Sequence, residues 1–313
     1  MDDIKQQIMT ARPHLRPVTI NNYMFTLHKL AQHIDGGTLD HFAFLIEVDD
    51  VMQYIETHAL TSQATMLTAI IVALTSETPR TPEIDDLVKE YRNIFYEKKR
   101  DISKLARGNN KNEKEVAQWK TLKQLHKIRD NIYNEVLAKH IPDKQGLTQS
   151  NKRLLQKYLI ASLYTYQPPR RNIYASTDLI NIKDFRRLRK EDHDANYLVF
   201  SKGFKTLFFY FGHQKSKLIQ EPKVDISPKL KKVLRLYLFF NHDQKHLIID
   251  RDGKQMSRNS LTQQIKSIFG MGASMLRKIY ISDKTKNYHK YIDKLAKKMG
   301  HSANTAKHSY LKN

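Results

Sequence analysis

Residues 166–172, YQPPRRN, divide the chain into two sequence patterns. Before them, apolar residues recur every three or four positions, as in the segment after Thr148, which is typical of amphipathic helices. Two consecutive prolines stop a helix, because each lacks a backbone N–H and its ring restricts the residue before it. Beyond them, short aromatic and β-branched runs at 196–200, 205–211 and 223–227 predict a small antiparallel sheet. Helical periodicity then resumes, so we predict a mainly α fold with a small antiparallel β-sheet (α+β).

The length of 313 residues fits two domains of about 150 residues each. Helical spacing continues through residues 1–105, and Thr81 followed by Pro82 is a typical helix start. Residues 106–115 are polar, basic and poor in apolar side chains, and a glycine and two asparagines there interrupt the helix. We therefore predict a helical domain over residues 1–105, a basic linker over 106–115 and a second domain over 116–313.

The chain carries a large positive charge: 54 Lys and Arg against 32 Asp and Glu, a net charge of +22. Nucleic acid is the expected partner, because each neutralised phosphate releases counterions. An anionic membrane surface is the alternative, but no basic amphipathic helix dominates the sequence. There is no cysteine, no apolar run of about 20 residues and no N-terminal signal pattern. We expect a soluble, intracellular protein.

Common enzyme signatures are missing from the sequence. It has no glycine-rich phosphate loop, no His-Glu-x-x-His and no Gly-x-Ser-x-Gly, and its 14 histidines lack metal-ligand spacing. We therefore expect no cofactor and no catalytic metal. What remains is an ordered series of basic residues and one tyrosine, none of them distinctive alone. The series is Arg170 and Arg171, Lys215, Arg277, His301 and, nine residues later, Tyr310.

This order resembles the tyrosine recombinase (phage integrase) family, and the resemblance covers most of the chain. PPRRNIY (168–174) looks like the first arginine motif of the family, and FYFGHQKSK (209–217) looks like its β-hairpin lysine. SMLRKIY (274–280) resembles the His-x-x-Arg box, and MGHS (299–302) followed by Tyr310 resembles the final histidine and nucleophile motif. The arginine motif and the box look most like those of integrases from large DNA viruses and mobile elements.

Two further segments extend the resemblance to the rest of the chain. RPVTINNYMFTLHKL (16–30) is similar to the first helix of the core-binding domain of the family, and NEKEVAQW (112–119) is similar to the start of its catalytic domain. The resemblance implies a helical DNA clamp followed by a catalytic domain. It also implies double-stranded DNA as partner, a homotetramer on DNA, and a location with DNA in the host nucleus or cytoplasm.

The resemblance implies a role for each residue of the series. Tyr310 attacks the scissile phosphate and forms a 3′-phosphotyrosyl bond that a 5′-hydroxyl can reverse. Arg171 and Arg277 bind the non-bridging oxygens, for which the planar guanidinium is well suited. Lys215 protonates the leaving 5′-oxygen, and His301 supports the phosphate. These roles require neither a metal nor a high-energy cofactor.

Several positions depart from the family pattern and leave alternatives open. The box opens with Ser274 instead of histidine, and Lys278 follows the second arginine where histidine is common. Tyr174 replaces the acidic residue expected three places after Arg171, which weakens the buried support for that arginine. The remaining alternatives are Arg170 in place of Arg171 and Lys217 in place of Lys215.

The function implied is a site-specific recombinase or integrase. A type IB topoisomerase uses similar chemistry and is one alternative, and a DNA-binding protein with a decayed active site is another. Only three residues follow Tyr310, whereas many relatives carry a further C-terminal helix that docks on the next subunit. We therefore expect the subunits to be linked by another route.

Overall fold

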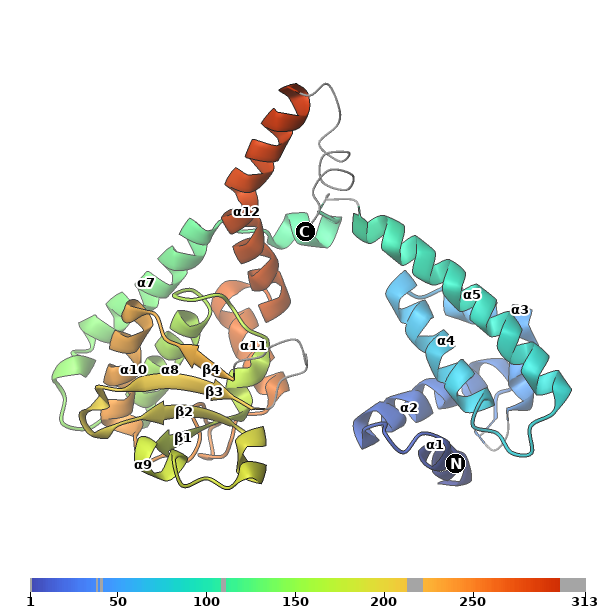
Figure 1. The fold of residues 1–313 in the computed structure, drawn as a ribbon, viewed down its shortest axis with the longest axis horizontal. Helices are drawn as coiled ribbons and strands as arrows, with labels where there is room; N and C mark the ends of the chain where they lie inside the picture. Colours follow the sequence, from blue (N-terminus) through green and yellow to red (C-terminus); the bar gives the residue numbers. More distant parts are fainter. Residues whose placement is uncertain (1, 38, 40–41, 108–110, 213–221, 299–313) are drawn as a thin grey trace. The chain divides into compact units, whose positions relative to one another are not determined.

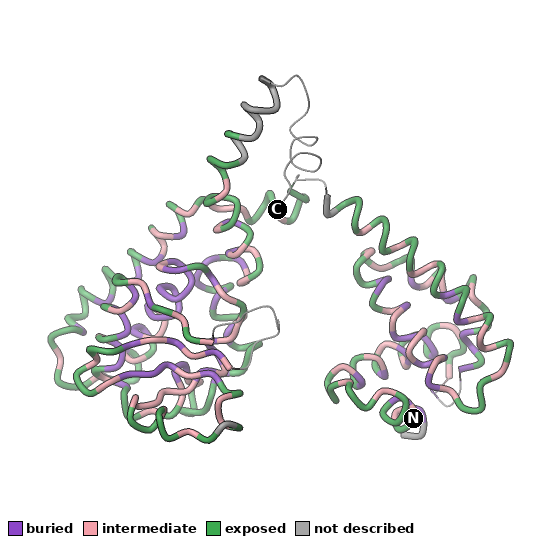
Figure 2. Tube along the Cα trace, viewed as in Figure 1, coloured by how far each residue is buried: buried purple, intermediate pink, exposed green. Residues whose placement is uncertain are grey.

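The computed structural model describes residues 2–37, 39, 42–107, 111–212 and 222–298 (Figure 1). The chain forms two compact units, residues 1–110 and 111–313. The division falls inside the segment 106–115 that the sequence predicts as a linker. In each unit the buried residues gather on the inner faces of the elements (Figure 2). The two units are described separately below.

Unit 1 is helical in all its regular elements among the described residues. In chain order they are α1 (Asp2–Ala11), α2 (Pro17–Ile34), η1 (Ala43–Leu45), α3 (Val48–Glu56), α4 (Leu60–Leu74) and α5 (Pro82–Arg107). Helices α2 and α5 each begin at a proline. Proline is well tolerated there, because the first backbone N–H groups of a helix make no intrahelical hydrogen bond and proline lacks only such a group. At the start of α5 the Thr81 hydroxyl accepts a hydrogen bond from the Ile84 backbone N–H at 3.4 Å. The apolar stripes of these helices form one core, in which buried Tyr91 donates to the Leu45 carbonyl at 2.8 Å.

Unit 2 combines helices with a small sheet. Its α-helices are α6 (Glu113–Gln118), α7 (Leu122–Ala138), α8 (Gln149–Leu163), α9 (Ile182–Phe185), α10 (Pro228–Asn241), α11 (Arg258–Phe269) and α12 (Ala273–Lys298). Short 3₁₀ helices are η2 (Ile141–Asp143), η3 (Asn172–Ser176), η4 (Lys190–Asp194) and η5 (Lys202–Phe204). The structure confirms the predicted fold class, mainly helical with a small sheet.

The sheet differs in detail from the prediction. Four strands, β1 (Thr177–Asn181), β2 (Asn196–Phe200), β3 (Leu207–Phe211) and β4 (Lys223–Asp225), lie in the order β1-β2-β3-β4. The β2–β3 and β3–β4 pairs are antiparallel as predicted, but β1 adds a parallel pair with β2. The sheet is therefore mixed and four-stranded. The three predicted strands are present and pair antiparallel, but the prediction missed β1 and its parallel pairing. The sequence of β1, TDLIN, lacks the aromatic residues of β2 and β3 and includes Asp178 and Asn181, residue types that are depleted in strands.

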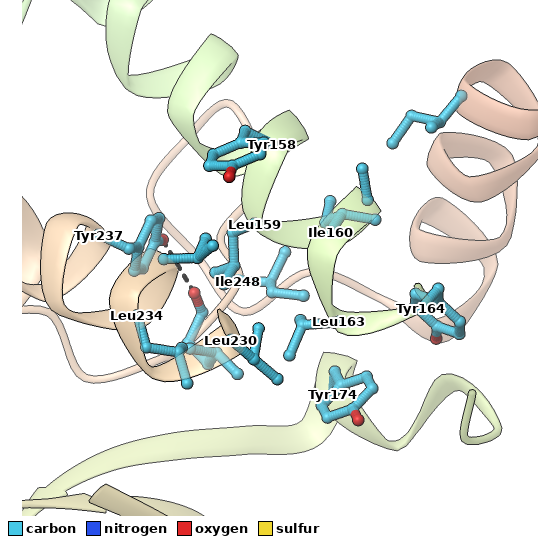
Figure 3. Packing of buried hydrophobic residues seen from close by; sticks show 14 of the residues in the cluster. Tyr158, Leu159, Ile160, Leu163, Tyr164, Tyr174, Leu230, Leu234, Tyr237 and Ile248 are labelled. Carbon is cyan, nitrogen blue, oxygen red and sulfur yellow. Dashed lines mark hydrogen bonds between the residues drawn. The ribbon is translucent and has the colours of Figure 1, made fainter. Parts of the chain in front are cut away.

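Helix α8 lies at the centre of the core of unit 2 (Figure 3). Its buried side chains include Leu155, Leu159 and Leu163, and it packs against α7, α10 and α11. From α10, the buried hydroxyl of Tyr237 donates to the Leu247 carbonyl at 2.9 Å, so this polar group remains satisfied inside the core. Tyr174 lies beyond the C-terminal end of α8, the end from which the double-proline turn leaves (Figure 3).

Candidate functional site

The double-proline turn sits where helix α8 gives way to the sheet. Helix α8 ends at Leu163, and η3 begins at Asn172 with Arg171 in an extended conformation at its N-cap. Pro168 and Pro169 prevent a helix from continuing through this turn. The two arginines that follow them have different environments. Arg171 is exposed, whereas Arg170 is half-buried.

Arg170 lies in a cavity of about 410 Å³. The walls come from the turn, from the connection between β4 and α10, and from α12, which contributes Tyr280. The guanidinium carbon of Arg170 is 4.6 Å from the ring centroid of Phe211, within the range of a cation–π contact. Phe211 is the last residue of β3, two places before the segment that carries the predicted Lys215. Arg170 thus connects the double-proline turn to the end of β3.

Arg171 faces solvent. Within the described residues its guanidinium has no ion pair and no side-chain hydrogen bond. The next residue is held firmly: the Asn172 amide donates to the Thr262 hydroxyl of α11 at 2.6 Å, and the Tyr164 hydroxyl donates to the Asn172 side-chain oxygen at 3.3 Å. An unpaired arginine next to an anchored residue is available to an external anion such as a phosphate.

Tyr174 stabilises the turn from beneath. Its side chain is fully buried, and its hydroxyl accepts a hydrogen bond from the Gln167 amide at 2.9 Å. Its ring lies 5.7 Å from that of Tyr164, close to the end of α8 (Figure 3). Burial raises the pKa of Tyr174 to about 12, although the Gln167 hydrogen bond and the Arg170 charge lower it. The neutral Tyr174 hydroxyl therefore holds Gln167 at the start of the turn. The resemblance led us to expect an acidic side chain at position 174, supporting Arg171.

A buried arginine on α7 supports the same region and was missed by the sequence analysis. The Arg129 side chain is only 7% exposed, and its Nη1 donates to the Thr165 hydroxyl at 3.3 Å. Its Nη2 lies 2.7 Å from the Asp130 carboxylate, and its guanidinium carbon is 3.8 Å from the ring centroid of Tyr166, which lines the cavity. The sequence did contain one indication that Arg129 is buried. It falls between Leu125 and Ile132 on the apolar stripe of α7, at a position where an apolar residue is expected.

The predicted box lies at the start of α12. Ser274 is exposed and Arg277 is half-buried, one helical turn before Tyr280 in the cavity wall. Lys278 forms an ion pair with Glu115 of α6, and this contact holds the pKa of Glu115 below its usual range. Lys278 therefore links α12 to α6 through this ion pair.

The structure brings the arginine turn and α12 to the same cavity through Arg170 and Tyr280. The predicted Lys215 and its alternative Lys217 lie outside the described residues, as do His301 and Tyr310. Among the residues that are described, no group of three or more His, Asp or Glu side chains is placed to hold a metal ion. In the same part of the chain, no helix is long and apolar enough to span a membrane.

Comparison with models of known protein families and with curated protein sequences found no match for this chain.

Proposed function

We propose that this protein is a site-specific DNA recombinase or integrase that cleaves and rejoins DNA through a 3′-phosphotyrosyl intermediate. The observation that carries the proposal is the arrangement at the cavity. The arginine turn and the helix of Arg277 both border it, and the strand that leads to Lys215 ends beside Arg170. The net charge of +22 supports nucleic acid as the substrate.

In the proposed reaction, the Tyr310 oxygen attacks the scissile phosphorus while the bond to the 5′-oxygen breaks. The tyrosine hydroxyl releases its proton to solvent water, and Lys215 gives a proton to the leaving 5′-oxygen. Arg171 and Arg277 bind the non-bridging oxygens, which gain negative charge in the transition state, and His301 donates to the same group. A 5′-hydroxyl reverses the step and rejoins a strand. Arg171 is exposed and forms no ion pair with any residue that the structure describes, so it suits this role better than Arg170, whose guanidinium is in contact with Phe211.

Strand exchange between two DNA sites requires a homotetramer assembled on DNA, with unit 1 acting as a clamp. In this proposal the protein works wherever its DNA resides, in the host nucleus or cytoplasm for a viral element. Route and symmetry of assembly are properties of the DNA complex. The number of subunits in the assembly can be measured by light scattering with and without DNA.

The test uses a nicked DNA duplex taken from the sequences that flank the gene. When the cleaved strand loses a short fragment, rejoining stops and the covalent product accumulates. We expect the full-length protein to form a DNA adduct that survives denaturing electrophoresis, and Tyr310→Phe to form none. Tight DNA binding without any adduct would instead support a DNA-binding protein with a decayed site.

A second arm separates the two enzyme classes. A supercoiled plasmid without the flanking sites is incubated with catalytic amounts of protein. Relaxation of this plasmid would support a type IB topoisomerase. Joint molecules formed only between two flanking sites would support the recombinase.

A further inference from the structure

The face of the sheet that points away from the core is covered by aromatic side chains. In β3, Leu207 and Phe209 enter the core, whereas the alternate residues Phe208 and Tyr210 point to the opposite face. The ring of Phe185 on α9 lies 5.0 Å from Tyr210 and 5.8 Å from Phe208, centroid to centroid. This cluster fastens α9 to the outer face of the sheet.

The segment from α9 to η4 is also fixed by hydrogen bonds. The Asn181 side chain accepts a bond from the Lys183 backbone N–H at 2.9 Å and so caps α9. The Arg187 backbone N–H donates to the Asp184 carbonyl at 3.0 Å, and the Tyr197 hydroxyl donates to the Asp192 carbonyl at 3.1 Å. The side chains on this segment therefore project from a preorganised surface.

Three exposed cations lie on this segment. Lys183 is on α9, and Arg186 and Arg187 are in the turn that follows the end of α9 at Phe185. Within the described residues none of the three forms an ion pair, whereas Arg189 pairs with Glu191 at 2.9 Å and with Asp192. The three unpaired cations are called the basic face below.

A fourth cation, on β4, borders the same outer face of the sheet. Lys223 of β4 pairs in register with Tyr210, and its ammonium lies 5.1 Å from the ring centroid of Phe208. Lys223 also comes two residues after the segment 213–221, which contains the predicted Lys215. The aromatic cluster is thus bordered by cations at α9 and by Lys223 of β4, while Asp225 of β4 lies opposite Phe208 on the same face.

We propose that the basic face, together with Lys223, binds backbone phosphates of duplex DNA beside the phosphate that is cleaved. This inference rests on the proposed function for the identity of its ligand. Duplex DNA fits because its closely spaced phosphates can bind several exposed cations that are carried on one hydrogen-bonded segment. The contacts add affinity and position the duplex, and they take no part in bond breaking.

The test measures how DNA affinity depends on salt. It uses the full chain carrying Tyr310→Phe, so that covalent trapping does not interfere, and a duplex of arbitrary sequence. Each phosphate contact contributes about 0.9 to the slope of log K against log salt, so Arg186→Gln/Arg187→Gln should lower the slope by about 1.8. Between 50 and 200 mM salt, the affinity of the parent protein should then fall about tenfold more than that of the double variant.

Arg189→Gln is the matched control, because it lies in the same segment but its charge is already paired with two carboxylates. It should change the slope by less than about half of one contact. An unchanged slope in the double variant, with a steep slope in the parent, would overturn the inference and leave the proposed function standing. A parent protein with no salt-dependent DNA binding would overturn both.

Discussion

Gly212 is the position where a single methyl group should disturb the predicted site most directly. It follows β3 and precedes the segment that carries Lys215. A Cβ atom placed there would lie 1.7 Å from the His193 carbonyl oxygen and 2.8 Å from the Ala195 carbonyl oxygen. Both contacts are with backbone atoms, which cannot move aside as the end of a side chain can. The Gly212 N–H also donates to the Ala195 carbonyl at 3.1 Å.

These contacts give a magnitude for Gly212→Ala. Overpacking of this kind typically costs about 1–3 kcal/mol. Loss of one buried backbone hydrogen bond adds about 1 kcal/mol. We therefore expect a loss of about 3 kcal/mol in the free energy of unfolding of unit 2. For a unit of this size, that corresponds to a fall in Tm of about 6–12 °C.

The assay is differential scanning calorimetry of the full chain, followed by adduct formation well below the lowered Tm. Gly146→Ala is the matched control, because a Cβ there meets nothing within 4 Å and the backbone is not in the left-handed region. It should leave Tm unchanged or raise it slightly. If Gly212 sets the path of the following segment, adduct formation by Gly212→Ala should also slow at temperatures where the protein is fully folded. A Tm for Gly212→Ala within about 2 °C of the parent would refute the reasoning.

Two other predictions concern the arginines around the turn. Arg171→Ala should reduce the rate of adduct formation about 10²–10³-fold with an unchanged Tm. Arg170→Leu should keep most of the activity, because leucine can still pack on Phe211. The reverse pattern would assign the phosphate contact to Arg170. Arg129→Met should lose about 2 kcal/mol of stability, because it removes a charged hydrogen bond and the stacking on Tyr166 while relieving some desolvation. Calorimetry should then show a fall in Tm of about 4–8 °C, with a smaller fall for Arg129→Lys, and equal Tm values for the methionine variant and the parent would contradict this account.

Local signals in the sequence were enough to predict most of the regular elements. Pro82 marks the start of α5, and Thr148 caps α8 through the Asn151 backbone N–H. Pro168 and Pro169 lie in the turn after α8, which ends at Leu163. Short runs of aromatic and β-branched residues predicted β2 and β3 to within two residues. These signals act over a few neighbouring residues, so they survive without knowledge of the rest of the chain.

The surroundings of the candidate site residues depend on contacts between distant parts of the chain. Lys278 looked like a possible supporting residue of the site, but its partner Glu115 lies 163 residues away in the sequence. Arg129 could be identified as buried only after Thr165 and Tyr166 were placed against it. Sequence spacing within a helix predicts which face a residue occupies, but not what that face meets.

The sequence by itself determined the helical character, the two-part division, the net charge of +22 and the double-proline turn. The tertiary structure decided that β1 joins the sheet in parallel with β2 and that Tyr174 is buried beneath the turn. It also separated Arg170 from Arg171, which are identical in type and adjacent in sequence. The Arg170 guanidinium lies against Phe211 and lines the cavity, whereas the Arg171 side chain is exposed to solvent. This difference arises only because segments that are distant in the sequence pack together around Arg170.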